Sequence, residues 1–251
     1  MRLALPLLPF ASLLAACGLA SARMSQDWAS VTDARLFRCC HVGNHGSGVL
    51  LAQDEKNLWI LTNAHLVDRV AKVHVVDPKT RRWIETTAWV TARGKPEAED
   101  FALLRSDALP FLAPFVTKLA APLEDGNSRT VDLLPVSVGD TPRAYPLPAV
   151  GRRTGFNNPE PPHAPFERDM VCVYGGVRQA NSGTPVFDGD RLLGLNELHP
   201  FDATFEKTGD DGQSTKQRVV GIGASSPQAI EAFLRGHGHA ALADRIVQRD
   251  G

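Results

Sequence analysis

Short apolar runs, each closed by turn-forming residues, constrain the fold of this chain more than any other feature. Polar turn signals such as residues 54–57 and 77–79 separate the runs of the first half. Those runs cover residues 36–42, 47–52, 59–62, 72–76, 82–91 and 101–105. Consecutive short runs bounded in this way are typical of antiparallel strands. The first half therefore predicts an antiparallel β-barrel.

A second group of runs follows a segment without a sustained period. Residues 106–127, which include Pro110, Pro114 and Pro122, are the candidate linker between two barrels. The later runs cover residues 130–138, 149–153, 170–174, 184–187, 191–196 and 219–224. Residues 155–168 and 199–217 are expected to be irregular loops. They are either specificity loops or surface insertions, because loops this long are uncommon without a role.

The C-terminal region has a helical pattern. Ser226 can cap the helix, Pro227 suits its first turn, and Gly236 can end it. Ile230, Phe233 and Leu234 have the spacing of one apolar helix face. Residues 240–247 can add a short helical turn.

Composition excludes some classes of function and favours an all-β fold. The chain has 251 residues, 43% of them hydrophobic, and a formal net charge of -1. This balance, without basic patches that alternate with aromatic residues, does not indicate a nucleic-acid partner. Its 21 Gly and 18 Pro, spread among short runs, suit a barrel or sandwich better than a helical fold.

The N-terminus predicts export. Arg2 and the apolar run over residues 3–19 resemble a secretory signal segment, which we assign to residues 1–22. Two processing sites overlap. A lipobox-like sequence would make Cys17 the lipidated N-terminus and anchor the protein to a membrane, whereas an A-x-A site ending at Ala22 would release it. We expect a location in the periplasm, on the bacterial outer membrane or outside the cell, and a polar tether over residues 23–35.

Three polar residues, each beside an apolar run, have the chemistry of acyl transfer. His65 follows one run, Asp100 precedes another, and Ser182 occupies an Asn-Ser-Gly turn before a third. A serine in a tight turn exposes its hydroxyl, a histidine can take the proton, and an acid can orient the histidine. Taken singly, these residues could equally be a core histidine, a strand cap and an inert turn.

In this order, with these flanks, the three blocks resemble the chymotrypsin-like serine peptidases. The resemblance is greater to the bacterial HtrA-type and V8-type (glutamyl endopeptidase-like) branches. Gly46-Ser47-Gly48 matches their Gly-Ser-Gly strand, and the blocks at 61–67, 99–104, 179–187 and 192–196 follow in the family order. The resemblance covers residues 36–234. It implies an all-β fold of two six-stranded antiparallel β-barrels, with a C-terminal helix that packs on the second barrel.

The resemblance also implies a domain arrangement and an activity. Residues 36–121 would form the first barrel with the linker, 122–236 the second barrel with the helix, and 237–251 a tail without a PDZ domain. The activity implied is that of a serine endopeptidase acting on polypeptides, without a cofactor. His65 would be the base, Asp100 its orienting acid and Ser182 the nucleophile.

Other site residues are carried over from the same families. The amides of Ala180 and Ser182 would form the oxyanion hole, although Ala180 stands where those families have glycine. Gly176 would lie near the base of the primary pocket. Asn196 stands where glutamyl endopeptidases have histidine, so a preference for small or apolar side chains is expected.

Two rival interpretations stay open. Ala180 could have abolished activity, which would leave a binding or chaperone-like protein of the same fold. Cys39, Cys40, His41 and His45 could form a metal site, but they lack the usual paired spacing and alternate between strand faces. For the same reason at most one of Cys39 and Cys40 can easily reach Cys172 in a disulfide.

Overall fold

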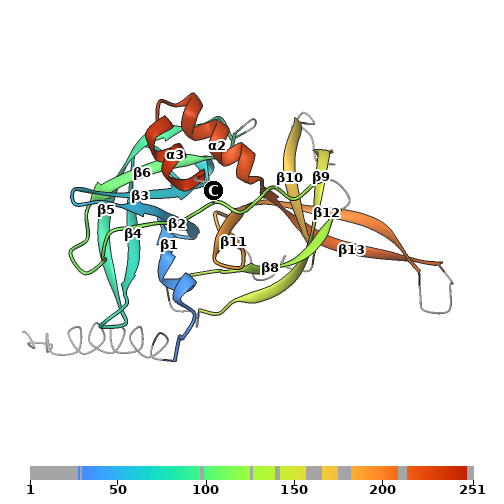
Figure 1. Cartoon of the computed structure of the whole chain (residues 1–251), viewed down its shortest axis with the longest axis horizontal. Helices are drawn as coiled ribbons and strands as arrows, with labels where there is room; N and C mark the ends of the chain where they lie inside the picture. The colour runs from blue at the N-terminus through green and yellow to red at the C-terminus, as the bar shows by residue number, and fades with distance from the viewer. Residues whose placement is uncertain are drawn as a thin grey trace, which may run out of the picture.

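The computed structural model describes residues 28, 30–96, 99–124, 127–138, 142–156, 166–174, 182–208 and 214–247. Two β-barrels lie side by side, and helices α2 (Pro227–Gly236) and α3 (Ala240–Val247) lie at the end of the chain (Figure 1). In the described residues no helix has both the length and the apolar character needed to cross a membrane. The signal segment predicted at residues 1–22, with Cys17, lies outside the described residues.

The first sheet is formed by strands from the first half of the chain. Its strands are β1 (Cys39–Val42), β2 (Gly46–Gln53), β3 (Asn57–Thr62), β4 (Val70–Asp77), β5 (Arg82–Arg93), β6 (Ala102–Asp107) and β7 (Phe115–Val116). The pairing order is β1-β4-β5-β6-β3-β2-β7, and β1 also pairs with β2. Because β1 pairs with both β4 and β2, the two ends of the run meet, and the short β7 is added at the edge of β2.

The second sheet is a closed barrel. Its strands are β8 (Ser128–Leu133), β9 (Tyr145–Phe156), β10 (Phe166–Tyr174), β11 (Pro185–Asp188), β12 (Arg191–Thr208) and β13 (Ser214–Ser225). They pair in the order β10-β13-β12-β11-β8-β9, and β9 pairs again with β10. The predicted all-β fold with two antiparallel barrels is therefore confirmed.

Three local expectations are wrong. Residues 199–217 were expected to be an irregular loop, but β12 and β13 pair continuously from Pro200–Ile222 to Thr208–Ser214 and extend away from the barrel (Figure 1). β9 and β10 likewise extend into the predicted loop at 155–168. The predicted strand at 36–42 begins only at Cys39, because a 3-10 turn over Ala34–Arg38 comes first, with Asp33 accepting a hydrogen bond from the Arg35 amide.

The core has three parts, one inside each barrel and one between them. Val73, Ile60 and Leu104 belong to the interior of the first barrel, and Val131 and Val186 to that of the second. The part between the barrels joins first-barrel residues, second-barrel residues, Trp28 and both helices. Burial of this apolar surface stabilises each barrel and also the seam between them.

The C-terminal helix forms as predicted but does not pack on the second barrel alone. The Ser226 hydroxyl accepts a hydrogen bond from the Ala229 amide, and Pro227 occupies the first turn. The Phe233 ring packs on Phe101 of the first barrel, with centroids 5.3 Å apart, and His239 packs on Trp59 of β3. The helices therefore cover the seam, since their apolar faces share one cluster with both barrels.

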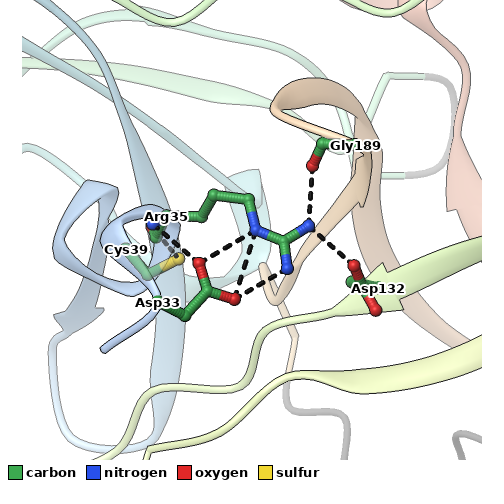
Figure 2. Close-up of polar contacts among 5 residues, drawn as sticks. All are labelled: Asp33, Arg35, Cys39, Asp132 and Gly189. Atoms are coloured by element: carbon green, nitrogen blue, oxygen red, sulfur yellow. Dashed lines mark hydrogen bonds and ion pairs between the residues drawn. The ribbon is translucent and has the colours of Figure 1, made fainter. Parts of the chain in front are cut away.

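Arg35 connects the segment before β1 to the second barrel. Its guanidinium forms an ion pair with Asp33 and a second one, at 2.6 Å, with Asp132 of β8 (Figure 2). It also donates to the carbonyl of Gly189 in the β11–β12 turn. The hydrogen bond from Arg35 lowers the pKa of the Asp33 carboxyl. Charge-assisted bonds of this kind fix geometry as well as adding stability.

A backbone hydrogen bond joins the two barrels where Ser182 lies. The Ser47 amide of β2 donates to the Ser182 carbonyl at 2.9 Å, and the Ser47 hydroxyl donates to the Val136 carbonyl. Gly183 has a φ of +79°, and a Cβ at this position would lie 2.0 Å from the Ser47 carbonyl oxygen. Only glycine permits this approach without a shift of the backbone.

We predict that Gly183→Ala destabilises the protein much more than Gly189→Ala. Both glycines have positive φ, but a Cβ at Gly189 meets nothing within 4 Å. Gly189→Ala should lower the free energy of unfolding by about 1–2 kcal/mol, the penalty of left-handed backbone. Gly183→Ala should lose about 1–3 kcal/mol more, because the added methyl overpacks the seam. Urea unfolding of the two variants measures the difference, and equal losses would contradict the prediction.

Candidate active site

The position of His65 is set by the end of β3. This strand ends at Thr62, and residues Ala64–Leu66 form a 3-10 turn that carries the histidine out of the barrel. Asn63, fully buried between them, donates from its side-chain amide to the Asp100 carbonyl at 2.9 Å. This hydrogen bond joins the His65 turn to the segment before β6, in addition to the contact between the His65 and Asp100 side chains.

His65 and Asp100 are in direct contact. The His65 Nδ1 atom lies 2.6 Å from Asp100 Oδ2, and the His65 backbone amide donates to Asp100 Oδ1 at 3.0 Å. Asp100 is 3% exposed. A carboxylate that accepts from Nδ1–H leaves Nε2 free to accept a proton. This is the arrangement that a general base requires.

Packing around Phe101 holds Asp100 in place. Phe101 is 2% exposed and lies against Phe233 of α2. The Phe101 carbonyl accepts from the Gly94 amide at 2.8 Å. Helix α2 thus packs on the residue that follows Asp100.

The surroundings of His65 favour its charged form. Its pKa is raised, first by the hydrogen bond to Asp100 and further by the charges of Asp100 and Glu197, while burial acts in the opposite direction. Negative charges near an imidazole stabilise the imidazolium that forms when the ring takes a proton. The electrostatics are therefore those of a base that becomes a cation during a reaction.

Ser182 begins the turn that leads into β11. The Gly183 amide donates to the Asn196 carbonyl at 2.9 Å, and the Asn196 amide donates to the Thr184 carbonyl at 2.8 Å. The Ser182 carbonyl accepts from Ser47, whose own carbonyl accepts from Thr62 at the end of β3. The serine turn therefore lies against the strand ends from which the His65 turn begins. Among the described residues no hydrogen bond joins the Ser182 hydroxyl to the His65 ring.

The remaining predicted site residues divide into two groups. Asn196 is fully buried and is paired through its backbone to the serine turn, so it supports that turn. Gly176 and Ala180 lie outside the described residues, so the proposed oxyanion hole and pocket base stay predictions.

In the part of the chain that the structure describes, Cys39, Cys40, His41 and His74 lie apart from the pair of His65 and Asp100. Cys39 and Cys40 are buried free thiols that belong to different apolar clusters, as the strand alternation predicts. The His41 ring lies 5.7 Å from the His74 ring of β4. No group of three His, Cys, Asp or Glu residues in the described part of the chain could hold a metal. The Cys172 side chain lies outside what the structure describes.

Sequence reasoning missed one residue of the site. Glu197 follows Asn196 on β12, is 2% exposed, and its charge acts on His65. The sequence signal was an acid placed directly after the apolar run at 191–196. In the structure Leu192, Leu193 and Leu195 of that run are all fully buried. A charged residue that continues such a run is rarely buried without a partner.

Comparison with known proteins agrees with the fold. The family model for Trypsin matches residues 40–207, which include His65, Asp100 and Ser182. The inactive form of the Rv3671c protease is 21% identical, with 87% of this chain and 96% of that chain covered and a TM-score of 0.54. The active form of the Rv3671c protease from M. tuberculosis is 20% identical, with 88% and 87% covered and a TM-score of 0.53.

At this identity the likeness to the two structures shows the fold, and no curated protein matches the chain. The family match covers more than half of the chain and agrees with its two barrels. The chain therefore belongs to the trypsin family of chymotrypsin-like serine proteases.

Proposed function

We propose that the protein is a serine endopeptidase in which Ser182 is the nucleophile, His65 the general base and Asp100 the acid that orients His65. The observation that carries the proposal is the 2.6 Å contact between His65 Nδ1 and the buried Asp100 carboxylate. That contact aims Nε2 away from Asp100. The serine turn docked on Ser47 supplies the hydroxyl from the second barrel.

The proposed reaction has two steps. The Ser182 hydroxyl proton passes to His65 Nε2 as Ser182 Oγ bonds to the peptide carbonyl carbon, and the carbonyl electron pair moves to its oxygen. The protonated His65 then gives its proton to the leaving amine, and an acyl-enzyme forms on Ser182. Water, activated by His65 in turn, releases the acyl group and restores the serine. The Ser182 and Ala180 amides are the proposed donors to the oxyanion.

Covalent labelling tests the nucleophile and its base. A fluorophosphonate probe should label the wild-type protein at Ser182, with no label in Ser182→Ala and little in His65→Ala. Ser128 and His45, both exposed, provide matched controls, and Ser128→Ala and His45→Ala should label like the wild type. Folded wild-type protein that takes no label would favour the rival function, a binding or chaperone-like protein that lost activity through Ala180.

The pH dependence of turnover tests the base. Because His65 must be neutral to accept a proton and its pKa is raised, kcat/KM should rise with pH through a midpoint above the ordinary histidine value of about 6.5. Asp100→Asn removes the largest cause of the raised pKa. It should move this midpoint to lower pH and reduce kcat by about 10⁴-fold. A peptide assay over pH 5 to 9 measures both, and an unmoved midpoint in Asp100→Asn would refute the assignment of His65.

We also propose that the protein is exported and works outside the cytoplasm, either lipidated at Cys17 or cleaved after Ala22. The sequence of the first 22 residues supports this location. Mass spectrometry of the mature protein should find a diacylated Cys17 or an N-terminus at Arg23. A mature chain that keeps Met1 would contradict export by either route.

A further inference from the structure

Glu197 lies next to the strand segment that holds the serine turn. It directly follows Asn196, whose backbone bonds to Gly183 and Thr184, the two residues after Ser182. The pairing of β12 with β13 shifts register here, because Asn196 pairs with Ala224 and the next pair is Pro200 with Ile222. Residues 197–199 therefore bulge out of the ladder. Bulges of this kind re-aim side chains and are frequent beside active sites.

The Glu197 side chain is buried and acts on His65 from the second barrel. A glutamate residue that is 2% exposed needs charged or hydrogen-bonding partners for its carboxylate, since an isolated buried charge is strongly unfavourable. Its charge raises the pKa of His65 in the same direction as Asp100, which approaches from the first barrel. The neighbouring cation, Arg93 of β5, donates to the Ala64 carbonyl and lies 3.7 Å from Asp68. Among the described residues, the charges that raise the His65 pKa are those of Asp100 and Glu197.

We infer that Glu197 is a positioning residue of this protease, a second carboxylate that acts on His65 from the opposite barrel. It holds the imidazole in place together with Asp100 and stabilises the imidazolium formed when Ser182 transfers its proton. The inference rests on the proposed function. It adds that the second barrel supplies both the nucleophile, Ser182, and a carboxylate, Glu197, whose charge raises the pKa of His65.

A direct test is the protonation of His65 in Glu197→Gln. NMR titration of protein with isotopically labelled histidine, with the His65 signal assigned by its loss in His65→Ala, measures the pKa without turnover. We expect Glu197→Gln to lower the His65 pKa by roughly half a unit to one unit, as loss of a nearby opposite charge should. The acid limb of kcat/KM should move down in pH by the same amount. A merely structural role for Glu197 would not produce this matched shift.

The matched control is Glu99→Gln. Glu99 is adjacent to Asp100 in sequence, but its exposed carboxylate lies 3.5 Å from His237, so its loss should leave the His65 pKa unchanged. If Glu197→Gln does not fold, Glu197→Met removes the same charge with a side chain of similar length. A His65 pKa equal to that of the wild type in the folded variant would overturn the inference.

The two proposals can fail separately. If wild-type protein takes no fluorophosphonate label but Glu197→Gln still lowers the His65 pKa, the peptidase assignment fails and the effect of Glu197 on His65 stands. If the wild type is labelled and the His65 pKa does not move in Glu197→Gln, Glu197 has no such role and the peptidase assignment stands.

Discussion

The hydrogen bond between the Ser47 amide and the Ser182 carbonyl determines how the two halves of the molecule fit together. It joins β2 of the first barrel to the turn before β11 of the second. The bond requires the backbones to approach so closely that no side chain fits at Gly183. Since Ser47 is also bonded to Thr62, the same contact fixes the serine turn relative to the end of β3. The geometry of the proposed triad depends on this one backbone approach.

The first barrel supplies the proposed base, His65, whose ring and backbone are both held by Asp100. Asp100 accepts from the His65 ring and from the His65 amide, and it is shielded by the packing of Phe101 on Phe233. Burial makes these contacts stronger than they would be in water and makes an unpaired partner costly. The positions of His65 and Asp100 therefore depend on the packing of the core as much as on their own hydrogen bonds. The C-terminal helix, far along the chain, takes part in that packing.

Sequence reasoning predicted the elements whose patterns are local and missed those that depend on distant partners. The run before His65, the run after Asp100 and the cap at Ser226 are each specified by neighbouring residues, and the structure places them as expected. The β12–β13 hairpin was missed because a polar segment resembles a loop until its partner strand is known. The contact of α2 with Phe101 and the burial of Glu197 likewise result from packing between distant segments. No periodicity within either segment records them.

The segment that precedes the first barrel is part of the folded molecule. The Trp28 side chain is fully buried against Phe37 and Trp83, and Arg35 reaches across to Asp132 and Gly189 on the other barrel (Figure 2). Through Trp28 and Arg35 this segment contacts both barrels. Both expected maturation sites precede it, so maturation at either would remove the leader and keep this segment. Cleavage a few residues later would remove Trp28, whose ring packs against Phe37 and Trp83 in the core between the barrels, and would weaken that packing.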